Sequence, residues 1–211
     1  MSEFKKFWDD SHLQYMNKKE SYDDWLDKYL DFMPKDKSQI LELGCGGGNS
    51  TKYLTEKGYN VISTDLSQVA LERTKKNVPQ AKTMLLDIQE PLPFKDNQFS
   101  AVIADLCLHY FDEQKTKEIM QEIKRILKPD GVLCARVNST LDINHGAGQG
   151  KKIEENYYFV EGYKKRFFDV ETASKFFKII GKTQITEGDM MRYKEPKKVI
   201  EIISQKEENV K

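Results

Sequence analysis

The stretch that decides the fold runs from Gln39 to Ser50 and reads QILELGCGGGNS. Its first five residues predict a short apolar strand, which runs directly into a glycine-rich turn and then into a helix. Because glycine has no Cβ, a ligand can approach the backbone of such a turn closely. The free N–H groups at the start of the helix favour an anionic group there. The stretch therefore predicts a strand–turn–helix unit that binds a ligand.

Strands and helices alternate along the chain after this unit. Each apolar run is short enough for a strand, and each amphipathic segment between two runs is long enough for a crossover helix. Such alternation is typical of a doubly wound α/β fold, in which helices bury both faces of a parallel sheet. We expect strands at 39–43, 60–65, 82–87, 99–106 and 132–137, and helices at 50–57, 67–78 and 113–127.

The flanking segments predict a cover and a hairpin around this core. The spacing of apolar residues predicts two amphipathic helices in the first 38 residues. A helix at 169–180 precedes strands at 183–187 and 198–204, which the short turn around 195–196 makes an antiparallel hairpin. We divide the single domain, 1–211, into N-terminal helices 1–38, a cofactor-binding core 39–138, a substrate-side insertion 139–168, a C-terminal helix and hairpin 169–204 and a tail 205–211.

Composition excludes several classes of protein. The 34 Lys and Arg residues equal the 34 Asp and Glu residues, whereas a nucleic-acid or membrane-surface binder needs a basic surplus. No apolar run approaches the roughly 20 residues that span a bilayer. Three dispersed cysteines form no disulfide framework, and the three histidines lack metal-ligand spacing. We expect a cytoplasmic protein without a metal, as a monomer or homodimer.

A carboxylate follows the second strand at the place where a nucleoside cofactor would need one. Asp65 lies 21 residues after Gly44, where a carboxylate can bind both hydroxyls of a ribose. A dinucleotide loop of the form G-x-G-x-x-G would need glycine at position 49, which is Asn49. A loop beside the Glu42 carboxylate favours a ligand with an ammonium group over one with two phosphates. S-adenosylmethionine meets both requirements.

Five motifs resemble those of the class I S-adenosylmethionine-dependent methyltransferases. They are ILELGCGGG, VISTD, MLLDI, FSAVIADLCLHY and LKPDGVL, in the family's order between residues 40 and 137, with a looser likeness to 204. Within the family, the sequence is most similar to small bacterial methyltransferases of the tellurite-resistance type. The resemblance implies a sheet of order 3-2-1-4-5-7-6 with strand 7 antiparallel.

The resemblance also implies which residues hold the methionine part of the cofactor. Gly44, Gly46 and Gly48 would wrap it, and Glu42 would orient the loop and the ammonium group. Cys45 belongs to the same loop, and its thiol is expected to pack as a small apolar group.

Further residues carried over from the family would hold the adenosine part. Asp65 would bind the ribose, Leu66 would pack on the adenine, and Asp87 with the N–H of Ile88 would bind the adenine edge. Asp105 would lie near the ammonium and methyl groups, although the family often has a smaller or neutral residue there. A substrate-side or structural carboxylate is an equal alternative for Asp105.

Methyl transfer by direct displacement needs mainly alignment, and a base only if the acceptor arrives protonated. His109, Tyr110 and His145 are the candidate catalytic residues, because they follow a strand end or lie in the flexible insertion. The alternatives are a structural role for His109 and simple exposure for His145. Trp8 and Tyr15 on the first helix are candidates for a lid over the cofactor.

The acceptor is expected to be a small molecule, because the chain has a net charge of zero and offers no obvious surface for binding a polymer such as nucleic acid. Two other functions stay open at this point. One is a non-catalytic module that binds S-adenosylmethionine. The other is a nicotinamide-dependent oxidoreductase, which would need a dinucleotide loop and a catalytic Tyr/Lys or His set that we cannot place.

Overall fold

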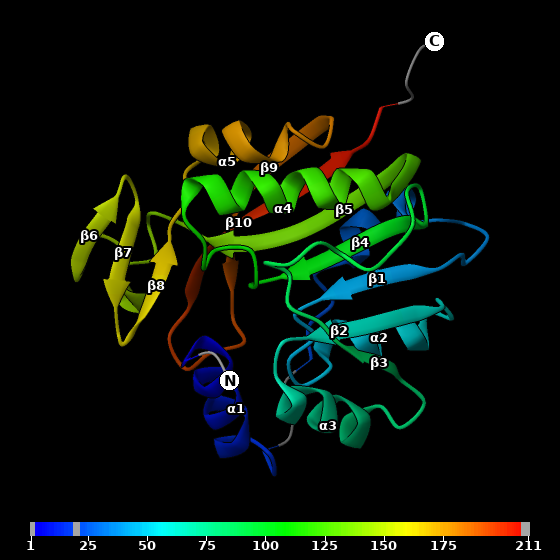
Figure 1. Cartoon of the computed structure of the whole chain (residues 1–211), viewed down its shortest axis with the longest axis horizontal. Helices are drawn as coiled ribbons and strands as arrows, with labels where there is room; N and C mark the ends of the chain where they lie inside the picture. Colours follow the sequence, from blue (N-terminus) through cyan, green and yellow to red (C-terminus); the bar gives the residue numbers. More distant parts are fainter. Residues whose placement is uncertain (1–2, 19–21, 208–211) are drawn as a thin grey trace.

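A seven-stranded sheet in the order β3-β2-β1-β4-β5-β10-β9 forms the centre of the protein (Figure 1). The computed structural model describes residues 3–18 and 22–207. The first five strands are mutually parallel, and β10 is antiparallel to both β5 and β9. The predicted strand order and the antiparallel hairpin are therefore confirmed. The strands are β1 (Ile40–Leu43), β2 (Val61–Asp65), β3 (Lys82–Leu85), β4 (Phe99–Asp105), β5 (Leu127–Asn138), β9 (Lys182–Met190) and β10 (Lys197–Gln205).

The crossover helices begin at polar caps that the sequence supplies. The Ser67 side chain accepts a hydrogen bond from the Ala70 N–H, and Asp112 accepts one from Lys115. Asp169 and Thr172 form a reciprocal capping box. Each cap satisfies an N–H that the first helical turn would otherwise leave without a partner. The helices are α2 (Asn49–Glu56), α3 (Gln68–Asn77), α4 (Glu113–Ile126) and α5 (Val170–Phe177).

The sheet is buried on both faces, as the apolar strand sequences predict. Along β4, Val102 and Ala104 belong to one hydrophobic cluster, whereas Ala101 and Ile103 belong to the other. The first cluster contains the apolar stripes of α4 and α5, and the second contains Leu54 of α2. Alternate strand residues therefore face opposite helical layers, as the pleat of a strand requires.

The N-terminal cover differs in part from the prediction. Helix α1 (Glu3–Gln14) forms, but the expected second α-helix is wrong: over the described residues 22–38 the helical structure is a short 3₁₀ helix, η1 (Asp27–Phe32). Its aromatic and aspartate residues favour the α-helix weakly. Leu26 and Tyr29 are buried at a spacing of three, which suits a 3₁₀ helix packed on the sheet.

The insertion, 139–168, contains a separate three-stranded antiparallel sheet that was not predicted from the sequence. Its strands are β6 (Lys151–Glu154), β7 (Tyr157–Val160) and β8 (Tyr163–Arg166). In Figure 1 this small sheet lies on the side toward which the arrowheads of β1 and β4 point. The Arg166 N–H donates to the His109 carbonyl at 2.7 Å, so β8 is attached to the loop that follows β4.

Candidate functional site

A cavity of about 570 Å³ lies at the carboxyl ends of β1, β2 and β4. Helix α1, the glycine turn, the loops after β3 and β4, the small sheet and the β9–β10 turn contribute its walls. Ligands of open α/β sheets bind at this edge, where the parallel strands end and the helices begin. Twelve of the predicted site residues line this cavity: Glu42, Gly44, Cys45, Gly46, Asp65, Leu66, Asp87, Ile88, Asp105, His109, Tyr110 and His145.

The glycine turn has a backbone that side chains would disrupt. Gly44, Gly46 and Gly48 have left-handed φ angles of 65°, 53° and 89°. A Cβ on Gly44 would lie 2.5 Å from the Cβ of Cys107, which no real side chain tolerates. Gly48 is the one glycine of the three outside the cavity wall, and a Cβ there would press on Thr74 at 3.3 Å. The turn is thus an open cradle whose shape depends on glycine.

Hydrogen bonds to β2 and α3 hold this turn in place. The Cys45 N–H donates to the Thr64 carbonyl at 2.8 Å, and the Thr74 hydroxyl donates to the Gly46 carbonyl at 2.9 Å. The Cys45 thiol is buried against Thr74, with Sγ 3.4 Å from Oγ1. Neighbouring Ser50 is buried, and its hydroxyl has no hydrogen-bond partner among the described residues. The cradle is preorganised and leaves this hydroxyl available to a ligand.

Glu42 is a buried carboxylate beneath the turn. Its Oε2 accepts hydrogen bonds from the Thr51 hydroxyl at 2.5 Å and the Ser63 hydroxyl at 2.9 Å. Burial raises the pKa of Glu42 to about 7, against the opposing effect of these two hydrogen bonds. A cation that enters the cavity would favour the ionised form and bind the carboxylate in return.

Asp65 sits at the end of β2 and faces the cavity. Its Oδ2 accepts from the Gly46 N–H and its Oδ1 from the Ser67 N–H, both at 2.9 Å. Burial raises the pKa of Asp65 to about 6, although these backbone bonds oppose the shift. Each carboxylate oxygen can accept a second hydrogen bond, so two neighbouring hydroxyls can still bind.

The residues predicted for the adenine follow β2 and β3. Leu66 and Ile88 are half-buried apolar side chains in the cavity wall. Asp87 accepts from the Gln89 N–H at 2.9 Å through Oδ1. Together they offer two apolar side chains with one carboxylate beside them, an arrangement that suits a flat heterocycle with an amino edge.

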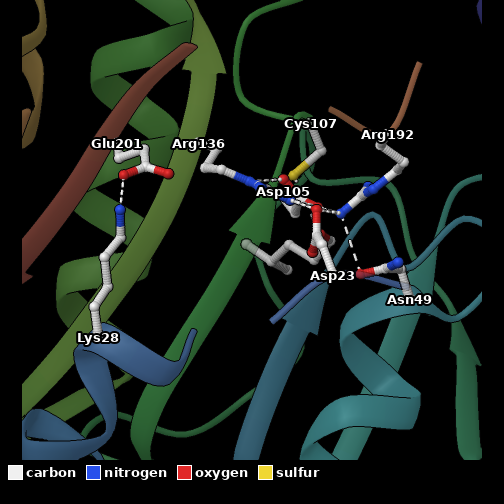
Figure 2. Close-up of polar contacts among 9 residues, drawn as sticks. Asp23, Lys28, Asn49, Asp105, Cys107, Arg136, Arg192 and Glu201 are labelled. Carbon is white, nitrogen blue, oxygen red and sulfur yellow. Dashed lines mark hydrogen bonds and ion pairs between the residues drawn. The ribbon is translucent and has the colours of Figure 1, made fainter. Parts of the chain in front are cut away.

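Asp105 belongs to a buried ion network, shown in Figure 2. Arg136 binds it through two hydrogen bonds, of 2.7 and 2.8 Å, and Arg192 binds Oδ2 at 2.8 Å. Asp23 pairs with Arg192 at 2.9 Å and with Arg136 at 3.2 Å. Burial acts to raise the pKa of Asp105, but the two guanidinium groups outweigh it and hold that pKa below its ordinary value. Both oxygens of Asp105 therefore have cationic partners within the protein.

Helix α1 covers the glycine turn. Trp8, His12 and Tyr15 all line the cavity, and His12 Cε1 lies 3.5 Å from the position of a Cβ on Gly46. His12 Nδ1 is 2.9 Å from an Arg73 nitrogen on α3. Burial, together with the Arg73 guanidinium, lowers the pKa of His12 to about 4, so its ring is neutral at pH 7. The two predicted lid residues lie in the cavity wall.

The three candidate catalytic residues have different surroundings. Tyr110 packs edge-on to Trp8 with ring centroids 5.1 Å apart, and burial raises the pKa of its phenol well above the ordinary value. The His145 Nδ1 lies 2.8 Å from Oδ1 of the fully buried Asp142. His109 is buried, and burial together with nearby lysines lowers its pKa well below 6.5. At pH 7, Tyr110 is therefore a hydrogen-bond donor and His109 a neutral imidazole.

Several residues of the site were missed from the sequence. Arg136 stands within an otherwise apolar strand, VLCARVN, and a charge in such a buried run was the available signal. Arg192 and Asp23 lie in irregular segments, and no local pattern marks them. His12 lies four residues beyond Trp8 on the same face of the first helix, and this spacing was the signal that could have found it.

Comparisons with known proteins agree with this geometry. Residues 41–135 match the methyltransferase domain family. Over 96 residues, the chain is 39% identical to an uncharacterised methyltransferase of Synechocystis, covering 46% of this chain and 45% of the relative. Residues 41–135 of this chain form a methyltransferase domain. It spans about half the length of the curated relatives it matches first.

Solved structures share the fold of this methyltransferase domain. One from Methanosarcina mazei has a TM-score of 0.71 at 18% identity and covers 90% of this chain and 99% of its own. Another, a 1,6-didemethyltoxoflavin-N1-methyltransferase from Burkholderia thailandensis with S-adenosylhomocysteine bound, has a TM-score of 0.65 at 18% identity and covers 87% of this chain and 76% of its own. The narrower likeness to the tellurite-resistance type stays a prediction.

The cofactor of this family, S-adenosylmethionine, fits the residues present. The cradle of Gly44 and Gly46, the Glu42 carboxylate and the Asp65 carboxylate line one continuous cavity. Within residues 3–18 and 22–207, no three His, Cys, Asp or Glu side chains are grouped as a metal site would need. No helix in the described parts of the chain has both the length and the apolar character to cross a membrane.

Proposed function

We propose that the protein transfers the methyl group of S-adenosylmethionine to a small-molecule acceptor by direct displacement. The observation that carries this proposal is the meeting of the glycine cradle, Glu42 and Asp65 in one cavity of about 570 Å³. A cavity of this size accommodates a cofactor and a small acceptor together. When bound, S-adenosylmethionine supplies a methyl group that its sulfonium already activates.

The cofactor end of the cavity is defined by acidic and apolar residues. Glu42 would attract the ammonium group, Asp65 would accept from the ribose hydroxyls, and Asp87 would accept from the adenine amino group. Leu66 and Ile88 would contact the faces of the adenine ring. The position of these side chains in the cavity wall supports the proposed roles.

The protein's contribution to the reaction is chiefly position and exclusion of water. Helix α1 places Trp8 and His12 over the glycine turn, and Tyr110 and Tyr163 continue this aromatic wall. Holding the acceptor and the activated methyl group in line replaces a bimolecular encounter. A water-poor cavity also removes the solvent that would otherwise surround the nucleophile.

If the acceptor arrives protonated, we propose that His145 is the base that accepts this proton. Its Nδ1 faces the buried Asp142 carboxylate at 2.8 Å, so Nδ1–H donates there and Nε2 keeps a lone pair. His109 is less suited, because its environment holds its pKa far below 6.5 and weakens it as a base. Burial raises the pKa of Tyr110 well above its ordinary value, so its phenol stays protonated at neutral pH and does not act as a base.

Binding and turnover can be tested separately. Calorimetry should show binding of S-adenosylmethionine and no binding of NAD, and labelled methyl groups should then enter a metabolite extract. Binding of NAD alone would favour the oxidoreductase alternative. Binding of S-adenosylmethionine without any transfer would leave a cofactor-binding module as the function.

A further inference from the structure

Two buried lysines line the end of the cavity nearest β10, across the sheet from Glu42, Asp65 and Asp87, which belong to or follow β1, β2 and β3. Lys165 of β8 is 5% exposed and Lys197 of β10 is 7% exposed, and both line the cavity. A lysine is almost never buried to this degree without an anionic partner. Each has one: Lys165 pairs with Glu161, which is itself largely exposed, and Lys197 pairs with Asp142 at 2.6 Å.

Backbone pairing brings these lysines to the same place. The Arg166 N–H bonds to the His109 carbonyl, which holds β8 and Lys165 beside His109. On the main sheet Asn138 pairs with Val199, so Lys197, two residues earlier, shares the face of Asn138. Both ammonium groups contribute to lowering the pKa of His109, in agreement with this placement.

Hydrogen-bonding capacity remains unused at this end. Lys197 donates to Asp142 Oδ2 and lies 5.9 Å from the centre of the Tyr193 ring, and its other two N–H donors have no hydrogen-bond acceptor within the described residues. The Oδ1 of Asn138 and the Nδ1 of His109 are also unpartnered among those residues, although the two side chains are 1% and 2% exposed. Buried polar groups are normally paired, so such a cluster in a cavity wall indicates a ligand.

Resting on the proposed function, we propose that the methyl acceptor is an organic carboxylate that also carries an O–H or N–H donor. The carboxylate binds the Lys197 ammonium with Lys165 nearby, and the O–H or N–H group donates to Asn138 Oδ1. Three carboxylates of the protein lie in this region, and each already has a cationic partner. Glu161 lines the cavity but is largely exposed and pairs with Lys165, Asp142 is fully buried against Lys197 outside the cavity lining, and both oxygens of Asp105 are held by arginines.

The first test sorts acceptors by charge. A deproteinised metabolite extract is separated on an anion exchanger at pH 8, and each fraction is incubated with the protein and methyl-labelled S-adenosylmethionine. Label should enter the retained, anionic fraction. Label confined to the unretained fraction would overturn the carboxylate assignment while leaving methyl transfer intact. No label in any fraction, with cofactor binding intact, would overturn both.

The second test uses variants with matched controls. Lys197→Met should raise the KM for the anionic fraction about tenfold to a hundredfold, the range for a lost hydrogen bond to a charged group, with cofactor affinity unchanged. Lys197→Arg should keep the KM close to the wild-type value. Lys198→Met, which changes the exposed next residue, should behave as wild type. If Lys197→Met does not fold, Asn138→Ala serves in its place with the same expected rise. Kinetics of these variants indistinguishable from wild type would refute the site.

Discussion

Replacing Asp105 with Asn tests whether the buried ion network stabilises the fold. The substitution keeps the shape of the side chain and removes the charge that two guanidinium groups share. The Arg136 side chain is 3% exposed, so water cannot replace the lost partner. Removing one partner of a buried pair costs about 3–5 kcal/mol. Because Asp23 still faces both arginines, we expect the lower end, about 3 kcal/mol.

Urea unfolding followed by circular dichroism measures this loss. The midpoint should fall with an unchanged m-value, and the melting temperature should drop by about 6–12 °C for a domain of this size. Asp189→Asn is the control, since its pair with Lys198 is about half exposed and contributes no more than about 1 kcal/mol. A loss for Asp105→Asn as small as that of the control would refute the network's role.

The same network predicts how acid affects stability. The pKa of Asp105 in the folded protein lies below its unfolded value, so its contribution is present above about pH 4 and is lost as pH falls through the folded pKa. Wild type should therefore lose more unfolding free energy than Asp105→Asn below pH 4. Adding Arg192→Met to Asp105→Asn should recover part of the loss, because it removes one uncompensated cation.

Three further predictions concern the cavity. Asp65→Ala should weaken S-adenosylmethionine binding at least tenfold by calorimetry, about 1.4 kcal/mol, through loss of a charge-assisted contact; an unchanged affinity would contradict the ribose assignment. His145→Ala should lower kcat at least tenfold with cofactor affinity intact. The same pattern in His109→Ala, with His145→Ala fully active, would transfer the role of base to His109. The folded pKa of Glu42 is about 7 against an ordinary 4.5, so the unfolding free energy of the ligand-free protein should fall by about 3 kcal/mol as pH rises between these values. Glu42→Gln should flatten that dependence, and a wild-type curve that is already flat would show that Glu42 ionises normally.

The main sheet could be predicted because each of its elements is specified locally. The FSAVIAD run of β4 is apolar on both faces, and caps such as Ser67 and Asp169 fix where helices begin. Strand order then follows from the right-handed crossover rule and from the family resemblance. The glycine turn and Asp65 had to meet, because parallel β1 and β2 end at the same edge.

The small sheet was missed although its turns left a signal. Glu155-Asn156 and Glu161-Gly162 separate three short runs, and Asn156, Glu161 and Gly162 have positive φ angles. Two-residue connections of this kind are typical of tight hairpins. Each run is only four residues long, so it shows little of the apolar alternation that marks a strand.

The lysine end of the cavity, where we propose that the acceptor binds, could not be predicted from the sequence. It is formed by three segments that lie far apart in the chain. Lys165, Lys197 and Asn138 are each unremarkable in the sequence, and only the attachment of β8 to the His109 carbonyl and the β5–β10 register bring them together. Arg192 and Asp23 meet Asp105 across even longer separations. Long-range pairs between irregular segments have no periodicity from which to predict them.

The cavity is divided electrostatically in a way that suits the proposed reaction. Glu42, Asp65 and Asp87 line one end and favour a cation, whereas the donors of Lys197 and Lys165 at the other end favour an anion. Where a cationic donor meets an anionic nucleophile, charge disappears in the transition state, and an environment that solvates charge less well than bulk water favours that loss. If the carboxylate serves only as an anchor, its charge persists in the product. The charge of the labelled product therefore distinguishes attack by the carboxylate, which yields a neutral ester, from attack by the neighbouring O–H or N–H group, which yields a product still retained by an anion exchanger.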